Sequence, residues 1–303
     1  MKRLENDMAD YVLTCSSTAD LPTQFTTQRD ITVLPYQIFM NGKEYYDDQG
    51  VSISTHDFYD KVRAGSMPTT SMVNTERYIA FFTPFLEAGK DILHIEFSSG
   101  LSGSYDNAVL TAQQLMEKYP QRKIIIVDSL CAARGYGLFV HLISDQKIAG
   151  MPIEQAAKYA EDLKINIMHW FAVDSLEHLR RGGRVSRVSA FLGTMLNIKP
   201  VLSFNYDGKI IPIEKIRGRK KSLVELVNKM EEDIDNPDGQ IVYIGHGDAL
   251  EDAQYVEQLI KERFPTIKET HIHYIGPVIG AHSGPATIAI HYIGKHRIGS
   301  EFK

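Results

Sequence analysis

Short apolar runs alternate with amphipathic segments along the first half of the chain. Tyr11–Thr14, Ile92–Phe97 and Lys123–Asp128 are rich in β-branched and aliphatic residues, which predicts strands. Tyr105–Tyr119 and Arg134–Ala149, which follow the last two of these runs, have the length and apolar spacing of helices. Because strand, loop, helix and strand follow one another, the pattern predicts a parallel sheet with crossover helices.

Other segments of this half predict local elements. Ile31–Met40 is a further extended apolar run, and the Asn41-Gly42 pair after it is typical of a hairpin turn. Thr55–Arg63 and Thr75–Ala88 have helical patterns. Between them, Gly65–Ser71 has the composition of a loop.

The second half has a different pattern. Two strand-like runs, Lys199–Asn205 and Lys209–Lys215, flank Tyr206-Asp207-Gly208, and this spacing predicts an antiparallel hairpin. The fold class we expect is therefore α/β with two domains. Residues 1–160 would form a parallel-sheet α/β domain, and residues 161–303 an α/β domain with a mixed, partly antiparallel sheet.

Composition narrows the class of protein. The 303 residues are 43% hydrophobic and 23% charged, which is ordinary for a globular protein and excludes disorder. A formal net charge of −5 argues against a general nucleic-acid binder. The N-terminal residues lack the apolar core of a signal peptide, and no segment is long and apolar enough to cross a bilayer, so we expect a cytoplasmic protein without stable membrane insertion. Two cysteines, Cys15 and Cys131, are too few for a disulfide framework and are interpreted as reduced, partly buried thiols.

The segment Ser98–Ser104 (SSGLSGS) is the strongest candidate for a binding loop. It lies between a predicted strand and a predicted helix, where α/β sheets bind ligands. Small residues allow close approach of the backbone, and free N–H groups with serine hydroxyls favour an anion. It is neither a phosphate-binding Gly-Lys-Ser/Thr loop nor a Gly-x-Ser-x-Gly nucleophile turn, although His282 as a possible base leaves hydrolysis open. The alternative interpretation is an ordinary cap on a buried helix.

Two further loops carry candidate polar groups. Pro68–Ser71 (PTTS) is rich in hydroxyls, and by composition alone it is equally consistent with a turn or a helix cap. Gly276–Pro285 is rich in glycine and proline and contains His282, an imidazole that could donate a hydrogen bond to an oxyanion. A purely structural role for His282 remains the alternative.

Basic and metal-binding patterns are weaker. Leu179–Arg184 and Lys215–Lys221 are basic runs in an acidic protein, which indicates solvated surface or a docking patch for a partner or phosphate. His271 and His273 share one face of a predicted strand, but no third ligand lies nearby in the sequence. We therefore predict no metal and no cofactor.

Taken together, these motifs resemble the DegV family of bacterial fatty-acid-binding proteins, which work with a fatty acid kinase. The resemblance rests on Ser17–Pro22 (STADLP), Pro68–Ser71, Ser98–Tyr105 (SSGLSGSY) and Gly276–His282, supported by Gly183-Arg184 and Pro200–Leu202. It spans nearly the whole chain, in the family's order. SSGLSGSY in this setting is its most specific element.

The resemblance implies two α/β domains with an acyl chain in a tunnel between or beneath them. It further implies that Thr69 and Ser99 hold the fatty-acid carboxylate, with Thr70, Ser98 and Gly100 adjacent and His282 beside the carboxyl group. By the same resemblance, Arg184 and Arg217 match arginines linked to function or to docking of the kinase. The ligand would be a long-chain fatty acid, the partner a separate kinase subunit, and the protein a carrier, not an enzyme, that feeds phospholipid synthesis.

Two positions depart from the family pattern. Ser16 stands where the family usually has an acidic residue, and Met72-Val73-Asn74 replaces a usual Gln-Pro after the hydroxyl-rich loop. These changes predict a difference in the polarity of the head-group pocket or in chain preference.

Physical chemistry is compatible with a lipid carrier. Each buried methylene contributes roughly 0.8 kcal/mol, so the tail can supply the affinity, and neutral hydroxyls at the head group would leave a carboxylate oxygen reactive. The competing hypothesis is an enzyme that acts on a small phosphorylated or dihydroxyacetone-like substrate through the serine loop. A deep apolar tunnel would favour the carrier, and a shallow polar cup the enzyme.

Overall fold

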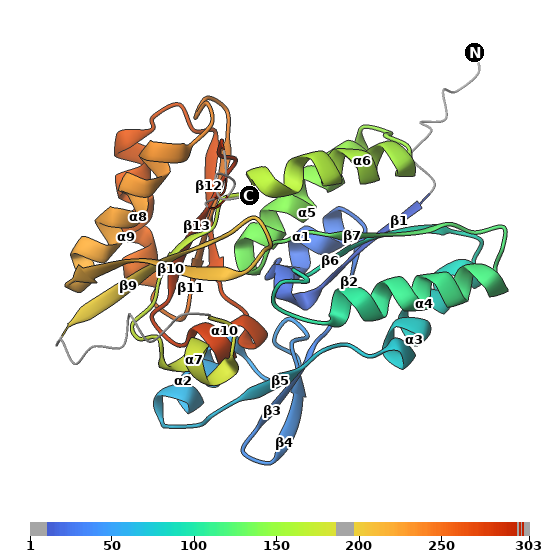
Figure 1. Cartoon of the computed structure of the whole chain (residues 1–303), viewed down its shortest axis with the longest axis horizontal. Helices are drawn as coiled ribbons and strands as arrows, with labels where there is room; N and C mark the ends of the chain where they lie inside the picture. Colours follow the sequence, from blue (N-terminus) through green and yellow to red (C-terminus); the bar gives the residue numbers. More distant parts are fainter. Residues whose placement is uncertain (1–10, 186–196, 296, 298, 300–303) are drawn as a thin grey trace.

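The computed structural model describes residues 11–185, 197–295, 297 and 299. Two large sheets with flanking helices lie side by side, and a small third sheet lies below the junction between them in the view of Figure 1. The N-terminal segment 1–10, where we expect no signal peptide, lies outside the described residues.

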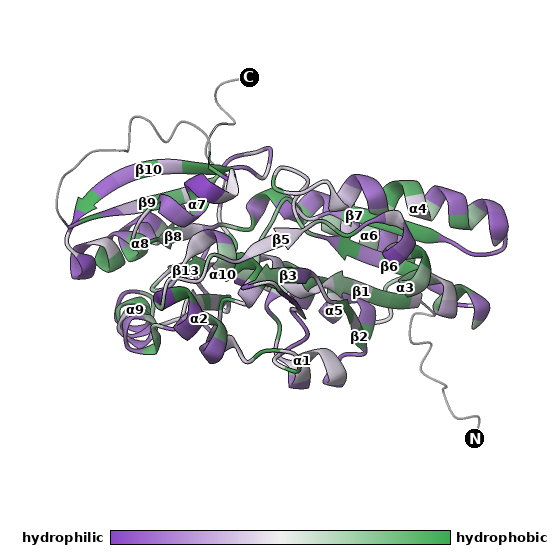
Figure 2. Cartoon of the chain, turned by 90° about the horizontal axis from the view of Figure 1, so that it is seen from below, coloured by the Kyte–Doolittle hydropathy of each residue, from purple (hydrophilic) through white to green (hydrophobic). Residues whose placement is uncertain are grey.

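The first sheet is parallel throughout, with the order β2-β1-β6-β7. Its strands are β1 (Tyr11–Ser16), β2 (Ile31–Leu34), β6 (Asp91–Glu96) and β7 (Ile124–Asp128). Helices α5 (Ala133–Ile148) and α6 (Ile153–Leu163) pack on one face and α3 (Thr75–Glu87) and α4 (Ser104–Lys118) on the other. Figure 2 shows the apolar colouring of the strands between them. A sheet covered on both faces requires nearly continuous apolar strands. The strands of this half can therefore be recognised from the sequence.

The second sheet is mixed and has the order β10-β9-β8-β13-β11-β12, with β11 and β12 parallel and the other pairs antiparallel. Its strands are β8 (Trp170–Ala172), β9 (Ile198–Phe204), β10 (Ile210–Arg217), β11 (Ile241–His246), β12 (Glu269–Tyr274) and β13 (Ile288–His291). The predicted hairpin is β9–β10, in which Gly208 takes the positive φ of +67° that the turn requires. The α/β class with one parallel and one mixed sheet is confirmed.

The third sheet, β4-β3-β5, corrects two predictions. Ile31–Met40 is not one strand, because Pro35 separates β2 from β3 (Gln37–Met40), which turns through Asn41-Gly42 into β4 (Lys43–Tyr46). Within the segment expected to be a loop, Thr69–Ser71 forms β5 and pairs with β3. A three-residue strand is too short to give a recognisable alternation, so only the pairing partner identifies it.

The four helices predicted in the first half of the chain are present as α2 to α5, whereas α1 and α10 were not expected. They are α1 (Thr23–Gln28), α2 (Thr55–Arg63), α3 (Thr75–Glu87), α4 (Ser104–Lys118), α5 (Ala133–Ile148), α6 (Ile153–Leu163), α7 (Glu177–Gly182), α8 (Arg219–Asp233), α9 (Leu250–Arg263) and α10 (Pro277–Ser283), with short 3-10 turns η1 (Ser17–Ala19) and η2 (Lys164–Asn166). The Gly276–Pro285 segment, expected to be a loop, contains α10. Pro277 begins it and Gly284, at φ +81°, follows it, a combination that favours a helix over a loop.

Helix α5 joins the two halves. It packs against β1 on one side and against β11 and β13 on the other, as Figure 1 shows. One hydrophobic cluster accordingly includes Leu13 and Ile95 from the first sheet and Phe171, Tyr243 and Ala289 from the second. The division at residue 160 stays a prediction.

Candidate functional site

A pocket lies between the two halves, and its non-atom space, including its open part, is about 770 Å³. Its apolar wall comes from loops, strands and helices of both halves. These residues are Phe97, Leu101, Ala132, Ala133, Phe171, Leu179, Phe204, Ile210, Ile275, Val278, Ile279 and Ala289. Apart from the two histidines His169 and His291, which lie deeper in the fold, the polar lining is grouped around α10 and the loops that face it.

Four polar residues of the lining, Thr70, Ser102, Arg184 and His282, form what we call the polar ring. Thr70 Oγ1, on β5, lies 2.7 Å from His282 Nε2, on α10. The His282 ring in turn rests on Gly182, where a Cβ would lie 2.2 Å from Nδ1. Arg184 donates from Nη1 to Gly182 O (2.5 Å) and from Nε to Leu101 O (3.3 Å), which links α7 to the serine loop.

The His282 imidazole is neutral at physiological pH. Burial, together with the nearby charge of Arg184, lowers its pKa to about 4. Its Nδ1 has no hydrogen-bond partner among the residues that the structure describes. Because an unpaired buried N–H is rarer than an unpaired acceptor, we place the proton on Nε2, donating to Thr70. The Thr70 hydroxyl hydrogen is then free to point into the pocket.

The serine loop contributes one hydroxyl to the lining, and it is Ser102. Ser98 is fully buried and donates to Gly208 O (2.8 Å), so its side chain anchors the β9–β10 turn. Ser99 is exposed, and its N–H donates to Asp128 Oδ1 (3.1 Å). Gly100 packs beneath the same turn, where a Cβ would lie 2.3 Å from Asp207 O. The structure thus places Ser98, Ser99 and Gly100 outside the pocket wall.

The residues of the hydroxyl-rich strand β5 also differ in whether they line the pocket. Thr69 is exposed and does not line the pocket, whereas Thr70, Ser71 and Met72 do. Ser71 Oγ donates to Gln37 Oε1 (3.1 Å), so its hydrogen is already used within the small sheet. Of the five predicted ligand-binding residues apart from His282, only Thr70 reaches the pocket.

The two predicted docking arginines have different environments. Arg184 is half-buried and lines the pocket, so it belongs with the polar ring and not with an outer docking surface. Arg217 is exposed at the end of β10 and is absent from the lining.

The departures from the family pattern have separate roles. Ser16 is buried and its hydroxyl lies 2.8 Å from Thr18 Oγ1, inside the fold. Met72 is 57% exposed and lines the pocket, which places it at the mouth. Val73 is fully buried, and Asn74 caps α3 by accepting from Arg77 N (3.0 Å). Only Met72 is placed to alter the pocket.

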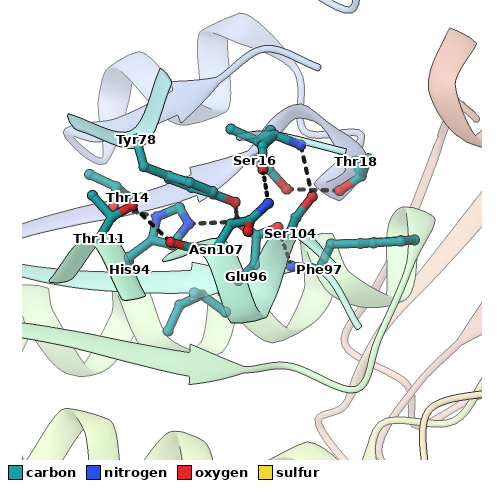
Figure 3. A network of polar contacts seen from close by, with 12 residues as sticks. Thr14, Ser16, Thr18, Tyr78, His94, Glu96, Phe97, Ser104, Asn107 and Thr111 are labelled. Atoms are coloured by element: carbon teal, nitrogen blue, oxygen red, sulfur yellow. Dashed lines mark hydrogen bonds and ion pairs between the residues drawn. The ribbon is translucent and has the colours of Figure 1, made fainter. Parts of the chain in front are cut away.

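A buried polar network lies behind the pocket (Figure 3). Glu96 accepts four hydrogen bonds: Tyr36 OH (2.9 Å) and Phe97 N (2.8 Å) donate to Oε1, and Tyr78 OH (2.6 Å) and His94 Nε2 (2.7 Å) lie at Oε2. Burial opposes ionisation of Glu96, but these bonds outweigh it, and its pKa is lowered. Since Tyr36 and Phe97 also line the pocket, the carboxylate holds part of its wall in place.

A second, polar cavity of about 560 Å³, including its open part, is lined by Asp20 and Asp47. Both carboxyl groups converge on Gly276, where a Cβ would lie 2.5 Å from Asp20 Oδ1 and 3.2 Å from Asp47 Oδ2. Burial raises the pKa of Asp47 to about 7 and that of Asp20 well above its usual range, the latter helped by the charge of Asp47. Burial therefore shifts both carboxyl groups toward their protonated form.

Metal-ligand chemistry is sparse in the part of the chain that the structure describes. One group there has metal-ligand spacing, formed by the exposed His56 and Asp60 with Asp248. Asp248 already pairs with Arg63 (2.6 Å), and this positive charge opposes binding of a metal cation.

Cys15 and Cys131 are both free and fully buried, and burial raises the pKa of both thiols. None of the described helices is long and apolar enough to span a bilayer.

The family described as "Uncharacterised protein, DegV family COG1307" matches residues 12–295. This chain belongs to the DegV family. A DegV domain-containing protein of Clostridium perfringens is 39% identical over 287 residues, covering 95% of this chain and 98% of the relative.

Solved DegV structures agree with this fold. A DegV family protein from Thermus thermophilus, described by its fatty-acid binding, superposes with a TM-score of 0.86 at 27% identity, covering 94% of this chain and 100% of the other. A stearic-acid-binding protein from Eubacterium ventriosum superposes with a TM-score of 0.83 at 26% identity, covering 94% and 98%. The DegV resemblance is therefore confirmed for the family and the fold.

Sequence reasoning missed Ser102 as a lining residue, whereas a position of Arg184 near the pocket mouth was an alternative that the sequence left open. Ser102 stands in the quoted SSGLSGS run, but the motif alone does not say which of its four serines turns inward. For Arg184, the signal was the adjacent Gly183, whose φ of +67° ends α7 and turns the chain toward the pocket.

Proposed function

We propose that this chain binds a long-chain fatty acid in the pocket between its two halves. The acyl chain lies along the apolar wall, the carboxylate accepts from Thr70, Ser102 and Arg184, and His282 lies beside the carboxyl group and orients the Thr70 hydroxyl. The observation that carries the proposal is one pocket with long apolar walls and a polar ring at α10. Fatty-acid binding by the structural relatives from T. thermophilus and E. ventriosum supports it.

The energetics suit this ligand. Each methylene buried along the wall contributes roughly 0.8 kcal/mol, so a long tail supplies most of the affinity. Two of the five N–H donors of Arg184 are held by main-chain carbonyls, so its guanidinium balances the carboxylate charge without enclosing it. One carboxylate oxygen can thus stay available for chemistry.

We further propose that the protein presents this oxygen to a separate kinase. The oxygen would attack the γ-phosphorus of ATP, the bond to the bridging oxygen would break, and ADP would leave, giving an acyl phosphate for phospholipid synthesis. The sequence has no Gly-Lys-Ser/Thr phosphate loop, so ATP would come with the kinase. Arg217, exposed and outside the pocket, is a candidate for docking that partner.

The competing function, an enzyme acting on a small phosphorylated or dihydroxyacetone-like substrate, finds less support. Such a substrate needs a polar cup, whereas this wall is dominated by aromatic and aliphatic side chains. The serine loop, its presumed oxyanion cradle, gives the pocket one hydroxyl, that of Ser102.

Denaturing mass spectrometry of protein purified from cells tests the binding function. We expect close to one equivalent of a fatty acid; a small phosphorylated metabolite in its place would support the enzyme. In a kinase-coupled assay, Arg217→Ala should slow acyl-phosphate formation at low carrier concentration while fatty-acid affinity stays unchanged. Equal loss of affinity would assign Arg217 to the ligand site instead.

A further inference from the structure

His291 places a polar atom on the wall far from the polar ring. It is the last residue of β13, whose side chains alternate between two cores. Ile288 and Ile290 face the cluster that α8 and α9 cover, while Ala289 and His291 line the pocket together with Thr287. An imidazole therefore stands among the apolar side chains of the pocket wall.

The hydrogen-bond pattern of His291 fixes its tautomer. Its Nδ1 lies 3.2 Å from Met168 O, and a carbonyl can only accept, so Nδ1 carries the proton. Burial lowers the pKa of His291 to about 3, so the ring is neutral and Nε2 is a bare acceptor. That Nε2 is buried and has no partner within the described part of the chain, on a side chain only 2% exposed.

The neighbouring His169 is also buried, but both of its ring nitrogens have hydrogen-bond partners. Its Nδ1 lies 3.0 Å from Ile167 O, and its Nε2 accepts from Ala132 N (3.3 Å). Both ring nitrogens are used within the fold, and the ring packs against Phe204 at 4.4 Å between centroids. Buried polar atoms are usually paired, so the orphaned His291 Nε2 calls for a donor from outside the chain.

We propose that the pocket prefers a fatty acid with a hydroxyl group part-way along its chain, donating a hydrogen bond to His291 Nε2. This rests on the proposed fatty-acid binding and adds the class of acyl chain. Thr287, which donates to Ser283 O (3.0 Å), marks the end of β13 next to His282. His291 lies four positions after Thr287 along the strand, about 13 Å away, so the hydroxyl belongs to the middle or distal chain and not beside the carboxyl group.

A hydroxyl is the chemistry that fits. The unpaired His291 Nε2 is an acceptor. A ketone or an ether can also only accept, so neither the ligand oxygen nor Nε2 would gain a hydrogen bond. A buried hydroxyl without a partner costs enough to weaken binding by about tenfold or more, and a hydrogen bond to Nε2 removes that penalty. An unsubstituted chain leaves Nε2 as it is, so such acids still bind.

The test is a double-mutant cycle between protein and ligand. Dissociation constants are measured by calorimetry for stearic, 10-hydroxystearic and 12-hydroxystearic acids with wild-type protein, His291→Phe and His291→Gln. Phe keeps an aromatic ring without an acceptor, and Gln can donate to Met168 O while its oxygen accepts. We expect at least one hydroxy acid to lose about five- to tenfold in affinity, relative to stearic acid, on His291→Phe. In His291→Gln that loss should be largely restored.

Each outcome has a definite meaning. A coupling below twofold for both hydroxy acids would overturn the inference and leave a bound water as the partner of Nε2, while fatty-acid binding itself would stand. If none of the three acids binds wild-type protein, the proposed function fails first. Should His291→Phe not fold, the wild-type protein alone decides: both hydroxy acids binding tenfold more weakly than stearic acid would contradict the preference.

Discussion

Thr70 Oγ1 and His282 Nε2 lie 2.7 Å apart although 212 positions separate the two residues along the chain. One comes from a three-residue strand and the other from a seven-residue helix, and neither element was expected from the sequence. The contact joins the small sheet to α10 and orients the Thr70 hydroxyl toward the pocket. The head-group site is thus a product of tertiary packing.

Replacing Thr70 by Val tests that site with little change of shape. We expect the dissociation constant for a fatty acid to rise by about 10- to 100-fold, because a hydrogen bond to a charged group contributes about 1.5–3 kcal/mol. Titration with a fluorescent fatty acid measures the change. The matched control is Thr69→Val, exposed and outside the lining, which should stay within about twofold of wild type. If Thr69→Val is the more damaging variant, the assignment by family resemblance is right and the proposed geometry is wrong.

The serine loop offers a second matched pair. Ser102→Ala removes the hydroxyl that lines the pocket, and we expect affinity to fall by about tenfold for the same reason. Ser99→Ala changes an exposed side chain and should leave affinity unchanged. Acyl-phosphate formation in the kinase-coupled assay gives an independent reading. Loss of activity with Ser99→Ala alone would move the carboxylate to the outer side of the loop.

Gly182→Ala should disturb the site through packing. Its Cβ would lie 2.2 Å from His282 Nδ1, so α7 and α10 must separate or the imidazole must rotate away from Thr70. We expect a loss of about 1–3 kcal/mol in the free energy of unfolding, together with weaker fatty-acid binding. At Gly103, a Cβ would meet only the flexible Met72 Sδ at 3.2 Å, so Gly103→Ala serves as the tolerated control. A fully stable, fully active Gly182→Ala would show that α7 and α10 are not tightly packed.

The carboxyl group of Asp47 predicts a pH dependence of stability. Its pKa is about 7 in the folded protein, against an ordinary value of 3.8, because it is buried. Between pH 4 and 7 the folded chain keeps a proton that the unfolded chain has released, so stability is full below this window and falls as pH rises through it. Asp47→Asn should flatten this fall and raise stability at pH 8 by about 1–3 kcal/mol. Urea unfolding at several pH values measures it, with the exposed Asp162→Asn as control. An unchanged pH profile would exclude Asp47 as the source.

Prediction from the sequence succeeded for the elements whose residue pattern has a single physical cause. The strands β1, β6 and β7 are apolar because they are covered on both faces, and the β9–β10 hairpin has its Asp207-Gly208 turn in the sequence. The family resemblance likewise located the loops that surround the pocket. Each of these predictions depends on residues that are neighbours in the sequence or on a motif of several residues.

The inward-facing side chains were harder to predict. Thr69 and Thr70 have the same chemistry, and which one faces the pocket depends on the register of β5 against β3. The Ser98 hydroxyl donates to a distant turn at Gly208, whereas that of Ser102 lines the pocket. Such choices depend on contacts between residues far apart in the sequence, so a motif identifies the loop but not the atom.

Helix α5 has a consequence for how a ligand can leave. Most of its side chains are buried between the two sheets, including Tyr136, Phe139 and Ile143, so it cannot act as a hinge without opening the core on both sides. Its amide protons should be among the slowest to exchange with deuterated solvent, at the rate of global unfolding. Release must then proceed by local opening where the cover is thin, at the exposed Met72 and the short helices α7 and α10. Exchange there should slow when the pocket is filled.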